Sequence, residues 1–110
     1  MTIETCVQIV DEILPSRVPD EMKLRFLGEV EGKIRVELLG EEPGDAFAFG
    51  EDTPWETELS APCPFDQLYW QYLLAMVSHV CGDSARYESA AILFNSSYQS
   101  YGKWLKRKGV

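Results

Sequence analysis

Hydrophobic side chains recur at steps of three and four between residues 65 and 81, which is the spacing of one face of an α-helix. The main stripe comprises Phe65, Leu68, Tyr69, Tyr72, Leu73, Met76, Val77 and Val80. A second stripe on a neighbouring face comprises Trp70, Leu74, Val77 and Cys81. A helix that is apolar on two faces must be covered on both. The second stripe therefore predicts contact either with another helix of this chain or with another copy of the chain.

The same spacing occurs in three other segments, so we expect an all-α fold of four helices. They are predicted over residues 3–14, 19–39, 65–81 and 84–106. Thr2 is the expected N-cap of the first helix, and Pro15 ends that helix. Pro19 followed by two acidic residues indicates the start of the second helix. Gly82 marks the break before the last helix.

The second predicted helix has an apolar face and a strongly charged one. Its expected buried face is Met22, Phe26, Leu27, Val30, Ile34 and Leu38. The residues expected to stay in water are Lys23, Arg25, Glu29, Glu31, Lys33, Arg35 and Glu37. Gly28 and Gly32 share one face of this helix, and glycine lets another backbone approach closely. This face predicts either a tight crossing within the chain or a contact between subunits.

Residues 40–64 break the helical pattern and form what we call the acidic arm, a loop with seven acidic residues, four prolines and no basic residue. Loops of this length are functional or disordered more often than short ones. Its aromatic residues Phe47, Phe49 and Trp55 predict anchors that either fold back on the domain's own core or dock on a neighbouring subunit. The alternation around Phe47 and Phe49 also fits a short strand, with a small β-hairpin through residues 50–53.

Length and composition favour a single domain over residues 1–110. A chain of this length has room for one core. The longest mostly apolar run, residues 68–81, is shorter than the ~20 residues that span a bilayer, so no membrane association is expected. The first residues include acids where a signal peptide has bases, so we expect the protein to remain in the compartment where it is made. Cys6, Cys63 and Cys81 are odd in number and irregularly spaced, which favours reduced thiols.

The net charge of −8 is unevenly distributed. Residues 1–66 carry sixteen acidic and five basic residues, whereas residues 67–110 carry two acidic and five basic ones. An acidic body binds duplex DNA poorly, because affinity for DNA comes mostly from neutralising phosphates, so no specific nucleic-acid binding is expected. The basic residues near the C-terminus either favour the end of the last helix or contact nucleic acid or an acidic partner. They are Lys103, Lys106, Arg107 and Lys108.

Residues with catalytic potential are few. His79 is the only histidine, so any catalytic triad or histidine metal centre would have to include it. No phosphate-binding glycine loop and no Cys-x-x-Cys motif occurs. Asp45, Glu51 and Asp52 lack the alternating spacing of a calcium-binding EF-hand loop. We therefore expect no enzymatic activity, no metal and no cofactor, and an exposed or interfacial position for His79.

Three segments resemble one protein family. They are FLGEVEGKI at residues 26–34, PFDQLYWQYL at residues 64–73 and ARYESAAILFNSSYQSYGKWL at residues 85–105. In this order and at this separation they are similar to the head-tail connector, or head-completion adaptor, family of long-tailed phages and prophages. The resemblance extends from Pro19 onward. It depends most on the proline-aromatic-aspartate start of the third helix and the aromatic spacing of the fourth.

The resemblance implies a small helical structural protein for virion assembly. Such a subunit assembles as a homo-oligomeric ring on the portal and links it to the next head-tail protein. Its implied location is the head-tail junction of the virion, and the cytoplasm of the bacterial host during assembly. The family has no shared catalytic residues to transfer.

An assembly subunit needs contact surfaces, and exposed aromatic residues are typical of them. The candidate residues for contact with a partner or another copy are Phe47, Phe49, Trp55, Trp70, Leu74, Tyr98, Tyr101 and Trp104. The alternative function is a non-viral helical adaptor or regulatory protein-binding module. A third, a metal or small-molecule enzyme, would depend on His79.

Overall fold

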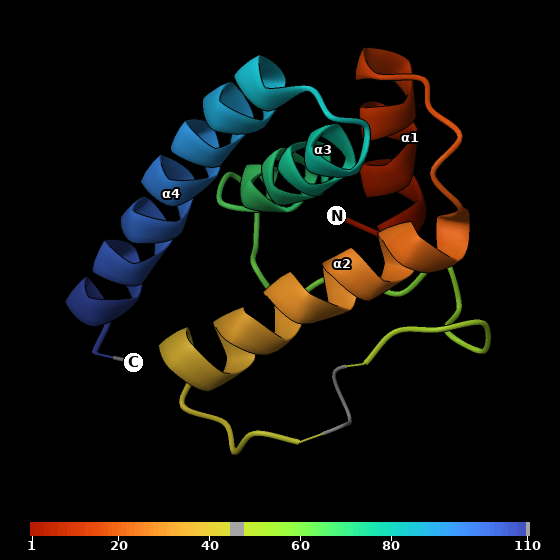
Figure 1. Ribbon diagram of the computed structural model, residues 1–110. Helices are drawn as coiled ribbons and strands as arrows, with labels where there is room; N and C mark the ends of the chain where they lie inside the picture. The colour runs from red at the N-terminus through yellow and green to blue at the C-terminus, as the bar shows by residue number, and fades with distance from the viewer. Residues whose placement is uncertain (45–47, 110) are drawn as a thin grey trace.

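The computed structural model describes residues 1–44 and 48–109, and these form a compact all-helical domain (Figure 1). The predicted all-α fold with four helices is confirmed. The helices are α1 (Ile3–Ile13), α2 (Asp20–Lys33), α3 (Gln67–Val80) and α4 (Ser84–Arg107), and the π-helical segment η1 (Ile34–Leu38) continues α2. The described helices do not combine the length and apolar content needed to cross a membrane.

Helix α3 is the centre of the domain and packs against α1, α2 and α4 (Figure 1). Leu68, Tyr69, Leu73 and Val77 are fully buried in it. Of the second apolar stripe, Leu74 and Val77 are buried, Trp70 is half-buried and Cys81 is exposed. The chain's own helices therefore provide most of the cover that the two stripes require.

Local signals account for several helix ends. The Thr2 Oγ1 atom accepts a hydrogen bond from the Thr5 amide at 3.1 Å, and Asp83 Oδ1 accepts one from the Arg86 amide at 3.1 Å. Gly82 has a φ of 77°, a conformation that glycine adopts readily at a helix C-terminus. Helix α3 begins two residues later than predicted, because Phe65 and Asp66 first donate their amides to the Pro62 carbonyl in a turn.

The prediction that every charged residue of the second helix stays in water is wrong for two of them. Lys23 is 3% exposed and Glu31 is 2% exposed. The Lys23 ammonium lies 2.7 Å from Asp11 Oδ1 and so joins α2 to α1. A buried charge is tolerated when it is paired and hydrogen-bonded, and both of these residues are. On α3, the polar residues Gln71 and Ser78 are also buried between helices.

The second half of the acidic arm runs antiparallel to the start of the chain. Its carbonyl groups at Thr57 and Trp55 accept the amides of Ile3 and Glu4 at 3.1 and 3.0 Å, and one isolated antiparallel bridge joins Thr2 to Glu58. These contacts satisfy amides that the first turn of a helix leaves without partners. Residues 50–53 form a hydrogen-bonded turn, and the described residues of the arm contain no strand.

Candidate interaction surfaces

The predicted contact residues occupy three kinds of position. Leu74 and Tyr101 are 7% and 2% exposed and belong to the core. Phe47 lies outside the described residues. The half-buried residues, each packed against the core with part of its surface open, are Phe49, Trp55, Trp70, Tyr98 and Trp104. Among the described candidates, this last group is the one that can contribute to a contact surface in the folded chain.

An aromatic cluster joins α4 to the segment just before α3. The ring of Phe65 lies 5.2 Å from the rings of both Tyr101 and Trp104. Nearer the start of α4, the ring of Phe94 lies 5.1 Å from that of Tyr72 and 5.6 Å from that of Tyr98. Aromatic pairs at such distances contribute about 0.5–1.5 kcal/mol beyond their buried area. These rings form an aromatic seam along the α3–α4 hairpin, and its main effect is to hold the hairpin together.

A buried polar network around Glu31 ties the end of the arm to α2 and α3. Glu31 Oε1 accepts a hydrogen bond from the Tyr69 hydroxyl at 2.7 Å, and Oε2 accepts from the Ser60 amide and hydroxyl, both at 2.9 Å. The Ala61 amide donates to the Tyr69 hydroxyl at 2.8 Å, and Arg35 Nε lies 3.7 Å from Glu31 Oε2. Burial, and then the neighbouring carboxylate, raises the pKa of the Tyr69 hydroxyl. The donors and acceptors of this network are one another's hydrogen-bond partners, so the network stabilises the fold.

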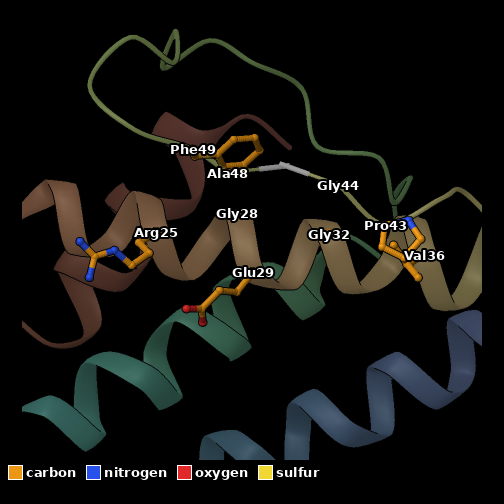
Figure 2. A pocket seen from close by; sticks show the side chains of 9 residues that line it. All are labelled: Arg25, Gly28, Glu29, Gly32, Val36, Pro43, Gly44, Ala48 and Phe49. Atoms are coloured by element: carbon orange, nitrogen blue, oxygen red, sulfur yellow. The ribbon is translucent and has the colours of Figure 1, made fainter. Parts of the chain in front are cut away.

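A cleft of about 440 Å³ separates α2 from the arm (Figure 2). Figure 2 shows Phe49 of the arm on the side of α2 that carries Gly28, with Glu29 pointing the other way. The other lining residues are Arg25, Gly32, Val36, Pro43, Gly44 and Ala48. The glycine face thus lines an open cleft whose other wall is a segment of its own chain.

A second pocket, of about 430 Å³, lies between η1 and the last turns of α4. We call it the basic pocket, because Lys103 and Lys106 line it and both are exposed. Its other lining residues are Glu37, Leu38, Tyr98, Gln99, Gly102 and Leu105. A Cβ atom on Gly102 would lie 3.4 Å from Leu38 Cδ2, so glycine leaves the floor of the pocket open.

The one carboxylate of the basic pocket is already engaged. Glu37 Oε1 accepts from the Tyr98 hydroxyl at 2.8 Å, and Oε2 lies 2.9 Å from the Lys33 ammonium. The hydrogen bond from Lys33, followed by that from Tyr98, lowers the pKa of Glu37. Burial and the contact with Glu37 raise the pKa of the Tyr98 hydroxyl. The lysines at the rim are consequently the charges available to a ligand.

Large apolar side chains are exposed at two further places. Ile92 and Leu93 of α4 are 69% and 49% exposed. Ile13, Val80 and Tyr87 are exposed where α1 and α3 end and α4 begins. The sequence analysis did not single out Ile92 and Leu93, although both fall outside the buried stripe of the last helix and are aliphatic. That departure from the stripe is the signal that identifies them.

The histidine and the three cysteines differ in their exposure. His79 is exposed, and its ring lies 5.4 Å from that of Tyr87. Cys6 is buried, which raises the pKa of its thiol, whereas Cys63 and Cys81 are exposed. Within residues 1–44 and 48–109, no three histidine, cysteine or acidic side chains are grouped so that they could hold a metal ion.

Comparison of the chain with models of protein families, with curated proteins and with solved structures gives no match.

Proposed function

We propose that the chain is a structural protein of a long-tailed phage or prophage, a head-tail connector subunit that assembles as a ring on the portal and joins head to tail. The observation that carries this proposal is the order and separation of the three family-like segments at residues 26–34, 64–73 and 85–105. On this proposal the protein acts at the head-tail junction of the virion, by binding other virion proteins and not by catalysis.

The arrangement of these segments in space supports the proposal. They fall on α2 with η1, on the start of α3 and on α4, and together they supply about half of the buried hydrophobic residues of the described chain. The aromatic residue before α3 and those near the end of α4 contact each other directly, through Phe65, Tyr101 and Trp104. Residues that are far apart in the sequence thus pack against one another, which gives a physical reason why the family-like segments occur together.

The outer surface of α4 supports an assembly function independently. Isolated exposed apolar side chains are common in soluble proteins, but Ile92 and Leu93 are consecutive and both are largely exposed. Their neighbours on the outside of the helix, such as Ser89, Ser96 and Gln99, are polar. We infer that this face of α4 contacts the portal or an adjoining connector protein.

Co-purification with a portal ring tests the proposal. The test co-expresses the chain with a portal protein from the same genome, and the expected result is a portal complex that carries this protein as an added ring in electron micrographs. Replacing Ile92 and Leu93 together with glutamate should abolish the complex. The matched control replaces Ser96 and Ser100, exposed on the same helix, with glutamate and should retain it.

Failure of the folded wild-type chain to bind any portal would contradict the proposal. The absence of portal and capsid genes beside this one would count against it as well. Both results together would favour the alternative, a non-viral helical protein-binding module.

A further inference from the structure

The acidic turn of the arm and the basic end of α4 lie at opposite ends of the molecule. In Figure 1 the turn at residues 50–53 is at the far right, and the last turn of α4 is at the far left. The turn carries Glu51 and Asp52, whereas the end of α4 carries Lys103, Lys106 and Arg107. All five side chains are exposed, and none forms an ion pair within the described part of the chain.

The basic pocket has the features of a receptor for a short acidic segment. Leu38 and Leu105 give it an apolar lining, and Gly102 keeps its floor open. Lys103 and Lys106 supply positive charge at the rim. The carboxylate that could repel an acidic ligand, Glu37, is engaged by Lys33 and Tyr98.

The acidic turn is opposite to this pocket in charge, and its conformation is already fixed. It is a tight turn, closed by hydrogen bonds of 3.0 Å from the Thr53 amide to the Gly50 carbonyl and from the Gly50 amide to the Thr53 hydroxyl. Glu51 and Asp52 project from it, and the exposed Pro54 that follows offers an apolar surface. A turn that is already closed loses little conformational entropy when it binds.

We propose that the acidic turn of one copy docks into the basic pocket of a second copy. Glu51 and Asp52 then pair with Lys103 and Lys106, and Pro54 lies against the apolar lining. The occupant is another copy because the same chain carries both complementary surfaces but places them at opposite ends, where they cannot meet within one molecule. Because the chain's net charge is −8, its acidic turn is attracted to few places on a second copy, and the exposed Lys103 and Lys106 are among them.

A contact of this kind is heterologous, since each copy offers its turn to one neighbour and its pocket to another. Heterologous contacts generate closed rings when the rotation between copies closes, and filaments otherwise. The inference rests on the proposed function for its biological setting, because it names the contact between neighbouring subunits of the assembly. It can nevertheless be tested without a portal.

The test mixes two charge-reversed variants of the full chain. The pocket variant carries Lys103→Glu and Lys106→Glu, and the turn variant carries Glu51→Lys and Asp52→Lys. Sedimentation equilibrium at low ionic strength, where exposed charges are screened least, measures association of each protein alone and of the mixture. We expect wild type to associate, each variant alone to associate about tenfold or more weakly, and the equimolar mixture to recover wild-type affinity.

Control variants separate this contact from effects of net charge and folding. The double substitution Arg17→Glu with Arg25→Glu has the same net charge as the pocket variant. The double substitution Glu12→Lys with Glu21→Lys has the same net charge as the turn variant. All four residues are exposed. Each control should associate like wild type. Circular dichroism and the melting temperature establish that all variants are folded, and Lys103→Gln with Lys106→Gln provides a pocket variant without reversed charge.

Three results would overturn the inference. The first is a wild-type chain that stays monomeric at low ionic strength, and the second is a mixture that associates no better than its components. The third is a pocket variant that loses portal binding while its self-association is unchanged, which would assign the pocket to a different partner. Charge-dependent self-association without portal binding would instead leave the inference standing and remove the proposed function.

Discussion

The hydroxyl of Tyr69 lies at the centre of the buried network, so its removal tests how much the network stabilises the fold. Tyr69→Phe keeps the ring, which is fully buried, and deletes a group that donates to Glu31 and accepts from the Ala61 amide. The substitution leaves a buried backbone amide and one carboxylate oxygen without these partners. A buried donor or acceptor that loses its partner is destabilised by its full desolvation penalty.

The expected loss of stability follows from these two bonds. A hydrogen bond to a charged group contributes about 1.5–3 kcal/mol, and a buried backbone donor without a partner costs about 1–3 kcal/mol. The two effects overlap because they share one hydroxyl, so we expect Tyr69→Phe to lower the free energy of unfolding by about 2–4 kcal/mol. For a chain of this length that corresponds to a decrease of roughly 9–17 °C in melting temperature.

Tyr72→Phe is the matched control, because Tyr72 lies on the same helix and loses the same group. Its hydroxyl donates to the exposed Glu29 at 3.2 Å, and water can replace that contact. We expect a change of no more than about 1 kcal/mol, measured like Tyr69→Phe by urea denaturation and thermal melting. Hydrogen exchange gives a local reading, because the Ala61 amide should lose protection in Tyr69→Phe alone. Equal effects of the two substitutions, or unchanged protection of Ala61, would refute the reasoning.

Three further predictions concern stability. Stability should fall as pH rises from about 10 toward 12, because tyrosines of the unfolded chain ionise near pH 10 and those of the folded chain ionise at higher pH. Burial raises the pKa of Tyr69, and burial together with Glu29 raises the pKa of Tyr72 to about 12. Circular dichroism between pH 8 and 12 measures this loss of stability, and a flat profile would contradict the prediction. Asp83→Ala removes the N-cap of α4 and should cost about 1 kcal/mol in urea denaturation, with Asp83→Asn retaining most of the stability. Lys23→Met should change stability by less than about 1.5 kcal/mol in the same assay, because a methionine fills the buried volume and the side chain of Asp11, which is 46% exposed, can turn to water. A loss above about 3 kcal/mol would show that the ion pair itself is required.

Helix positions were predictable because they depend on local spacing. Residues 3–14 and 84–106 were predicted as helices, and α1 and α4 span Ile3–Ile13 and Ser84–Arg107. Caps and breaks such as Thr2 and Gly82 act within a few residues of the helix end, so their effect can be inferred from the sequence. The π-helical end of α2 was not predicted, since inserting one residue into a turn leaves no distinct mark in the apolar pattern.

The burial of Glu31 could not be inferred from α2 alone. Its place among alternating charges fits a solvated face, and its partners Ser60 and Tyr69 are 29 and 38 residues away. The return of the arm brings Ser60 to the carboxylate, and the packing of α3 against α2 brings Tyr69 to it. Lys23 is buried for a similar reason, because the helix that covers it precedes α2 and supplies Asp11. Charge marks a residue as solvent-exposed only when no other segment brings it a partner.

The burial of the predicted contact residues also depends on segments that lie elsewhere in the sequence. The sequence predicts Tyr101 and Leu74 as contact residues, yet both are buried by the chain's own helices. Periodicity identifies which residues need cover but not which segment provides it. Ile92 and Leu93 lie outside the periodic stripe of the last helix, and the packing of α4 leaves both exposed.

The buried network and the acidic turn are mechanically connected, and this connection allows one more test. The arm is fixed after the turn by the bonds from Glu4 to Trp55 and from Ser60 to Glu31, so residues 50–53 are held at a defined place on the molecule. A binding segment that is held in place loses less entropy on docking than one that moves freely. Under conditions where it is still folded, Tyr69→Phe should therefore weaken self-association in the sedimentation assay, although Tyr69 itself is buried and cannot touch the neighbour. Tyr72→Phe should leave association unchanged. If both variants associate like wild type, the anchoring of the arm contributes nothing to docking.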